Sequence, residues 1–173
     1  MIRPQLVPLS VSKFGTFTVD YDQSIEYKMT QAIKRGGRHL GKWETRYASD
    51  TYFPDPRKGK KEYDAYAATF TKGSYQDDIE AWAKRDQYLL ATPKEGLDII
   101  VPSPRPAFDR FTPLQIAGQF CKLDWGDPHK RVALTFNKIG EDTRYLASSQ
   151  IYPLGRWSKS WPQLHLLVLR EVA

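Results

Sequence analysis

The first third of the chain predicts a strand followed by a helix. Residues Phe14–Tyr21 alternate between two faces around a glycine, a pattern typical of a strand. Apolar residues then recur at helical spacing, at Ile25, Met29, Ala32 and Ile33. Asp22 or Ser24 can cap this helix at its start, and Gly36-Gly37 can end it.

The middle of the chain has weaker periodicity. Between Arg38 and Lys61 prolines and glycines interrupt every pattern, which predicts a long loop. The stretch Glu62–Thr71 fits a helix or a strand equally well. Ser74, with Asp77 three residues later, resembles a capping box, and the apolar stripe behind it predicts a helix up to Leu90, before Thr92-Pro93.

The last part of the chain predicts mainly strands. Leu97–Val101 is a short apolar run typical of a buried strand, whereas Thr112-Pro113 is a helix start and predicts a short helix through Phe120. Three further strands are predicted, at Arg131–Ile139, Arg144–Ile151 and Leu164–Val172. The expected fold is α+β: two to three helices, mostly N-terminal, packed on an antiparallel sheet that ends in a C-terminal β-meander.

Composition agrees with a single domain spanning residues 1–173. A hydrophobic content of 40% and a charged content of 27% are those of a globular protein. The only cysteine is Cys121, which excludes an internal disulfide and a cysteine-based zinc site. No apolar stretch has the length of a signal peptide or a membrane span, so we expect a soluble, cytoplasmic protein.

Positive charge is concentrated in one window, residues 28–61. Ten cations and three anions lie there, a net charge of +7, whereas the whole chain carries +6. The remainder therefore carries −1, and residues 62–98 alone carry −4, from eight acids and four cations. Lys28, Lys34 and Arg35 are expected on the outer, basic side of the first helix. Such segregated charge favours anionic partners.

Aromatic residues are interleaved with these cations, and cations beside flat rings are what single-stranded nucleic acid requires. Trp43, Tyr47, Tyr52 and Phe53 lie inside the window. We expect phosphate contacts from six cations and base stacking on two rings. The predicted nucleic-acid-binding residues are Arg35, Arg38, Lys42, Trp43, Tyr47, Lys58, Lys60 and Lys61.

The alternative interpretation of the window is a solvated loop whose rings are buried in the core, because charge runs are usually solvated. No established nucleic-acid motif accompanies the window, and Gly59-Lys60-Lys61 lacks the remaining residues of a P-loop. Trp157 and Trp161, in a later connection between strands, either present their rings to a ligand or close the end of the sheet.

Enzymatic chemistry has weaker candidates. A metal-free ribonuclease needs two converging histidines, here His39 and His129, and a metal-dependent nuclease needs converging acids, here Asp20 and Asp98. Roles in capping, packing or solvation explain these histidines and acids more economically than catalysis. We therefore expect no catalytic residue, no metal and no cofactor. The histidine His165 is expected to be a packed or edge residue of the last strand.

The sequence therefore favours a non-catalytic protein that binds nucleic acid, DNA or RNA, or a nucleoprotein complex. One alternative is a small bacterial or phage-encoded effector that inhibits or adapts another protein, with the acidic helix after Ser74 or the Trp157/Trp161 loop as its contact face. A nuclease is the second alternative.

Overall fold

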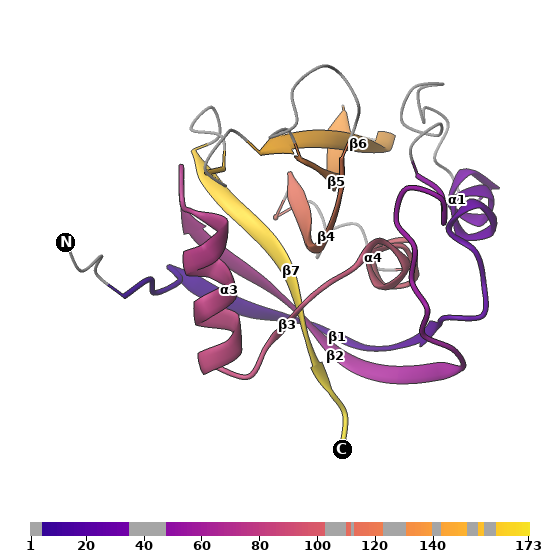
Figure 1. The fold of residues 1–173 in the computed structure, drawn as a ribbon, viewed down its shortest axis with the longest axis horizontal. Helices are drawn as coiled ribbons and strands as arrows, with labels where there is room; N and C mark the ends of the chain where they lie inside the picture. Colours follow the sequence, from indigo (N-terminus) through magenta and orange to yellow (C-terminus); the bar gives the residue numbers. More distant parts are fainter. Residues whose placement is uncertain are drawn as a thin grey trace.

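One mixed β-sheet runs through the molecule (Figure 1). The computed structural model describes residues 5–34, 48–102, 110–111, 113–122, 131–139, 143–151, 156–157 and 162–173. Six strands follow one another in the order β1-β2-β7-β4-β5-β6, and the two-residue strand β3 also pairs with β7. The strands are β1 (Ser10–Asp20), β2 (Lys60–Thr71), β3 (Leu89–Leu90), β4 (Leu114–Lys122), β5 (Arg131–Ile139), β6 (Thr143–Ile151) and β7 (Gln163–Glu171). All pairs are antiparallel except β4 with β7.

Helices cover both faces of the sheet. The described helices are α1 (Ile25–Lys34), α3 (Gln76–Arg85) and α4 (Pro93–Ile100). Helices α1 and α4 pack together over one end of the sheet, whereas α3 lies on the other side, beside β7 (Figure 1). The protein is therefore of the α+β class, as the sequence predicts.

The C-terminal half of strand β2 is buried on both faces, which explains its ambiguous sequence. Tyr63 and Ala65 face the core under α1 and α4, whereas Ala68 and Phe70 face the core under α3. A strand covered on both sides does not alternate between apolar and polar residues, so its period is hidden. The strand also begins at Lys60, so the last two lysines of the predicted loop belong to β2.

Several predicted elements are confirmed. Strand β1 contains most of the predicted strand, and α1 begins where the pattern places it. The Ser24 hydroxyl accepts a hydrogen bond from the Tyr27 N–H at 3.0 Å, which is the expected cap. The three C-terminal strands also form. The meander consists of β4, β5 and β6, whereas β7 returns to lie between β2 and β4.

The predicted strand at Leu97–Val101 is wrong, because this segment belongs to helix α4. Pro93 occupies the first turn, and the Thr92 N–H donates to Glu95 Oε2 at 2.7 Å, which closes a capping box. The helix is buried on nearly every side, and its apolar run is only a few residues long. A short run of this kind cannot be assigned to helix or strand by periodicity alone.

The predicted helix through Phe120 is also wrong, because the segment forms strand β4. Leu114 lies opposite both Phe136 in β5 and His165 in β7. Pairing on two sides stabilises an extended backbone and overrides the local helix signal of Thr112-Pro113.

Helix α3 is shorter than the pattern predicts. It ends at Arg85, and Gln87 adopts a left-handed backbone conformation with φ of 59°. Leu89–Leu90 then pairs with β7 instead of continuing the helix. The predicted Ser74 cap does not form, because its hydroxyl donates to the Thr71 carbonyl at 2.8 Å.

Candidate functional site

The structure describes three of the eight predicted nucleic-acid-binding residues, Lys58, Lys60 and Lys61. The other five lie outside the described residues, and they are Arg35, Arg38, Lys42, Trp43 and Tyr47. The histidines His39 and His129 and the indole of Trp161 also lie outside them. Lys58, Lys60 and Lys61 form the C-terminal end of the predicted basic surface.

The three lysines are exposed where the chain enters β2. The Lys60 side chain is 69% exposed, with its ammonium 3.7 Å from Asp20 Oδ2. The Lys61 ammonium contacts Glu171 Oε1 at 2.6 Å, and this hydrogen bond raises the pKa of Lys61. Both ion pairs are at the surface, where such pairs contribute little and exchange readily for other anions. Lys58 is exposed as well.

Lys28 is not part of the outer basic side of α1, so this prediction is wrong. The residue is 3% exposed, and its ammonium forms an ion pair with Asp98 in α4. Asp98 Oδ2 also accepts a hydrogen bond from the Asp20 N–H at 2.9 Å. The helical wheel of α1 places Lys28 outside the apolar stripe, but α4 packs against that side and supplies a buried carboxylate.

Arg57 is also taken up by internal contacts. Its guanidinium contacts Glu95 Oε1 at 2.6 Å and both oxygens of Asp55 at 2.6 and 2.8 Å, and it donates to the Thr92 hydroxyl at 3.0 Å. Burial lowers the pKa of Arg57, but the hydrogen bond to Asp55 and the charge of Glu95 outweigh it, so the net pKa is raised. For Asp55, burial raises the pKa, and Arg57 reverses this to a net lowering.

Two tyrosines complete a buried polar network around Glu95. The Tyr21 hydroxyl donates to Glu95 and lies 2.8 Å from the Tyr63 hydroxyl, and the Arg57 guanidinium lies 4.3 Å from the centre of the Tyr21 ring. Burial, followed by the hydrogen bond to Glu95, raises the pKa of Tyr21 above its usual range. The Lys94 ammonium donates to the Tyr21 carbonyl at 3.1 Å.

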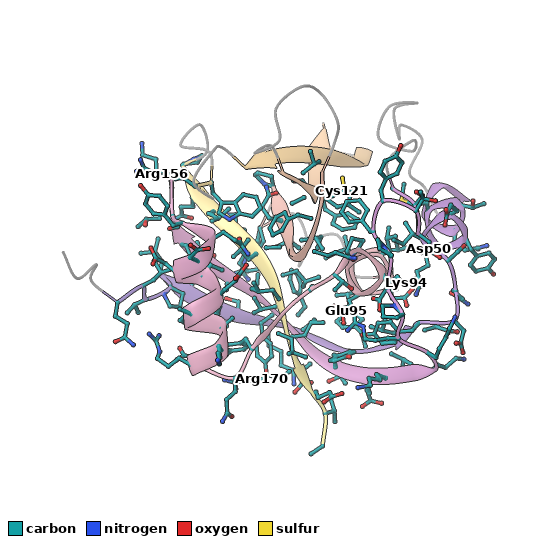
Figure 2. The ribbon with its side chains drawn as sticks, in the orientation of Figure 1. Asp50, Lys94, Glu95, Cys121, Arg156 and Arg170 are labelled. Carbon is teal, nitrogen blue, oxygen red and sulfur yellow. The ribbon has the colours of Figure 1, made fainter. Side chains whose placement is uncertain are left out.

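This network clamps the segment before Lys58 to helix α4. Figure 2 shows Lys94, Glu95 and Asp50 on the side of the molecule that carries α1 and α4. The Lys94 ammonium lies 3.7 Å from Asp50 Oδ1, and the Gln119 side-chain amide donates a hydrogen bond to the Pro54 carbonyl at 2.6 Å. The exposed lysines therefore follow a segment that is anchored at several points.

One aromatic ring of the basic window, outside the predicted binding residues, is in the core. Phe53 is fully buried, and Tyr52 packs partly against the same cluster. Phe53 is therefore unavailable for stacking on a base. Trp157 is fully buried too, and its indole N–H donates to Gln76 Oε1 at 3.0 Å, so this ring closes the sheet under α3.

The candidate catalytic acids Asp20 and Asp98 lie close together, but their contacts stabilise the fold. Asp20 and Asp98 are neighbours through the backbone contact described above, and Lys28 balances the Asp98 charge. Within the described ranges, no group of three or more histidine, cysteine, aspartate or glutamate side chains is placed to hold a metal ion. His165 lies in β7, its Nδ1 2.8 Å from the Thr69 hydroxyl, and burial lowers its pKa.

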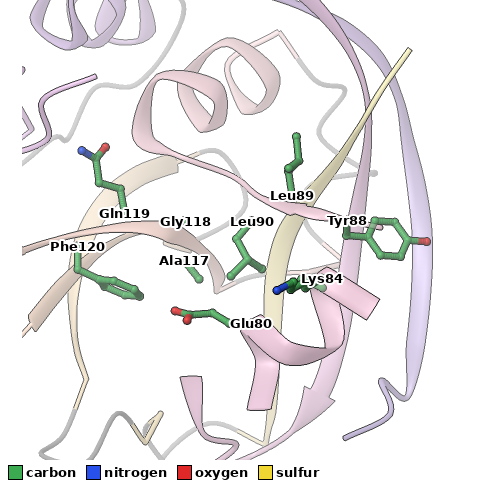
Figure 3. Close-up of a pocket in the computed structure, with 10 residues that line it drawn as sticks. Glu80, Lys84, Tyr88, Leu89, Leu90, Ala117, Gly118, Gln119 and Phe120 are labelled. Carbon is green, nitrogen blue, oxygen red and sulfur yellow. The ribbon is translucent and has the colours of Figure 1, made fainter. Parts of the chain in front are cut away.

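A cavity that the sequence did not predict lies between α3 and β4. Its volume is about 600 Å³, and Glu80, Lys84, Tyr88, Leu90, Gly118 and Phe120 are among the residues that line it (Figure 3). Sequence patterns cannot reveal it, because it forms where separate parts of the chain meet. In the sequence, the charged residues of the helix after Ser74 are the one feature that belongs to this region.

The chain was compared with models of protein families, with curated proteins and with solved structures, and none of them matches it. Among the helices that the structure describes, none is long and apolar enough to cross a membrane.

Proposed function

We propose that the protein is a non-catalytic binding protein that engages nucleic acid, or a nucleoprotein complex, through the basic surface of residues 28–61. The observation that carries the proposal is the exposed group Lys58, Lys60 and Lys61, which follows an anchored segment at the entry to β2. Because the backbone before these lysines is already anchored, neutralising phosphates with them does not require a loop to become ordered first.

The charge of the window remains high after the two buried ion pairs of its described residues are subtracted. Lys28 is balanced by Asp98, and Arg57 by Asp55, which lies in the same window. Eight cations then remain against Glu44 and Asp50, a net charge of +6. This excess, with Trp43 and Tyr47 as candidate stacking rings, fits a flexible single strand.

A salt series tests the proposal. Fluorescently labelled single- and double-stranded oligonucleotides are titrated from about 50 to about 300 mM salt, and log K is expected to fall linearly with log salt, because bound phosphates release counterions. Replacing Lys58, Lys60 and Lys61 by Gln should lower the slope by about one for each phosphate that a lysine no longer neutralises.

The matched control is a second triple variant that loses the same charge outside the basic window. Lys72, Lys84 and Arg85 are exposed and lie outside the basic window, so replacing them by Gln should leave the slope nearly unchanged. Equal slopes for both triple variants, a flat salt response or an absence of binding would contradict the proposal.

Stacking has a separate signature. The Trp43→Ala variant should weaken single-strand binding about tenfold, because base stacking contributes about 1–3 kcal/mol per base, while leaving the salt slope unchanged.

A protein partner is the alternative, and the acidic start of α3 favours it. Asp77 and Glu80 are exposed on that helix, next to Asp78, on the opposite face of the sheet from α1. Reversing these three charges should abolish partner capture and leave oligonucleotide affinity unchanged if this alternative holds. Cleavage of RNA or DNA by the purified protein, with or without magnesium, would instead indicate a nuclease.

A further inference from the structure

The cavity between α3 and β4 has the features of a small-molecule site. Its volume of about 600 Å³ lies within the usual range for ligand pockets, about 300–1,000 Å³. Apolar walls come from Ala83, Leu90 and Phe120, and the charged side chains of Glu80 and Lys84 contribute from α3 (Figure 3). The lining is therefore mixed, and ligand sites usually combine apolar walls with a few placed polar groups.

The wall formed by β4 is irregular. The pairing of β4 with β5 is interrupted between Ile116 and Cys121, and the residues of this interruption line the cavity. Gly118 instead donates its N–H to the Ala91 carbonyl at 2.8 Å, next to β3. The residues of β4 that leave the regular pairing with β5 therefore form one wall of the cavity.

The carboxylate of Glu80 is held in place by a buried side chain. Gln76 is 3% exposed, and its amide nitrogen donates to Glu80 Oε1 at 2.9 Å and to the Ala117 carbonyl at 3.2 Å. The Gln76 oxygen accepts from the buried Trp157 indole. One oxygen of Glu80 is thus fixed by a rigid network, and Figure 3 shows the carboxylate directed toward Ala117 and Phe120.

A positive charge lies one helical turn away. Lys84 is exposed and makes no ion pair with any residue in the described parts of the chain, Glu80 included. Side chains four residues apart on a helix have Cβ atoms about 5–6 Å apart. A carboxylate and an ammonium at this spacing can each bind one end of a compact ligand that carries both opposite charges.

We propose that this cavity binds a free α-amino acid with an apolar side chain. Its ammonium group pairs with Glu80, its carboxylate pairs with Lys84, and its side chain occupies the apolar space beside Leu90 and Phe120. The ammonium and the carboxylate of an α-amino acid are attached to the same carbon atom, so one such ligand is small enough to contact both Glu80 and Lys84, whose Cβ atoms lie about one helical turn apart. This site is independent of the basic surface of residues 28–61.

The test uses the intact protein and a set of capped ligands. Binding of L-phenylalanine and L-leucine is measured by calorimetry and by shifts of the backbone amide resonances of residues 117–120. N-acetyl-L-phenylalanine lacks the ammonium and L-phenylalanine amide lacks the carboxylate. Each is expected to bind about tenfold more weakly than L-phenylalanine, because each is without one hydrogen-bonded charge.

Two variants assign the charges separately. Glu80→Gln keeps an oxygen for Gln76 but removes the charge, and Lys84→Gln removes the other charge; both side chains are exposed, so both variants should fold. Each should weaken L-phenylalanine binding about tenfold. Glu80→Gln should not weaken N-acetyl-L-phenylalanine further, and Lys84→Gln should not weaken the amide further.

The control is Asp77→Asn, an exposed change on α3 outside the cavity, which should bind like the original protein. The proposal is overturned if neither amino acid shifts the resonances of residues 117–120 at millimolar concentration. Equal binding of free and capped ligands, or equal binding by Glu80→Gln and Asp77→Asn, overturns it as well. Oligonucleotide binding should be the same for all these variants.

Discussion

At the scale of single residues, Glu95 is where the buried polar contacts meet. It is 1% exposed and bonds to Tyr21, Arg57 and the Thr92 backbone. A buried carboxylate of this kind is stable only while each partner is in place. It joins helix α4 to the segment before the exposed lysines, so its role is to hold that segment against the helix.

Removing this carboxylate should destabilise the fold strongly. The Glu95→Ala variant is expected to lose about 3 kcal/mol of unfolding free energy, the lower end for a broken buried pair. The loss is at the lower end of the range because Arg57 retains its ion pair with Asp55, and because the Arg57 side chain is 35% exposed. Urea unfolding followed by tryptophan fluorescence measures the change. Arg85→Gln, which breaks the exposed pair with Asp86, is the control and should unfold with nearly the original midpoint.

At the scale of elements, the close approach of β3 and β4 shapes both the sheet and the cavity. A Cβ atom on Gly118 would lie 2.1 Å from the Leu90 carbonyl oxygen, a backbone atom that cannot move alone. The same addition to Gly96 in α4 would meet the Cδ1 end of Ile116 at 2.8 Å, which is side chain and can rotate. Gly118 is therefore required by a close backbone approach, whereas Gly96 is packed against side chains.

These constraints predict an order of stability. Gly118→Ala should lower the unfolding free energy by about 1–3 kcal/mol, as overpacking does, because β3 and β4 must separate. Gly96→Ala should lower it less, since alanine is favoured over glycine inside a helix by about 1 kcal/mol, which offsets part of the clash. Thermal unfolding of both variants measures the order, and a more stable Gly118→Ala than Gly96→Ala would contradict it.

At the scale of the whole molecule, β7 is the central strand. It pairs with β2, β3 and β4, and its apolar side chains enter both core clusters. Along the described sheet, β7 joins the pair β1-β2 to the meander β4-β5-β6, because it lies between β2 and β4. The last strand along the chain is thus the one that completes the sheet.

A chain that ends at Pro162 should therefore fail to fold at all. We expect the loss of cooperative thermal unfolding and of dispersed amide resonances, because three strands lose a partner together. A chain that ends at Glu171 lacks only two exposed residues and should retain both signals. Cooperative unfolding of the shorter chain would show that β7 is dispensable.

The sequence by itself determined the fold class and the elements with a clear local period. Helix α1 has an amphipathic stripe with Ser24 at its start, and the strands β1, β5 and β7 lie where alternating or apolar runs place them. Propensity, capping and period act within a few residues, so they can be recognised in a single chain. The concentration of cations between residues 28 and 61 is likewise a property of the sequence alone.

Only the tertiary structure decided what several ambiguous or misleading segments became. The apolar run that predicts a strand is helix α4, and the segment after the helix signal at Thr112-Pro113 is strand β4. Burial and strand pairing outweigh local preference at both places. Packing of α4 against α1 buried Lys28, and the meeting of α3 with β4 created the cavity at Glu80. Long-range contacts settle these outcomes, and no pattern within a short stretch of sequence contains them.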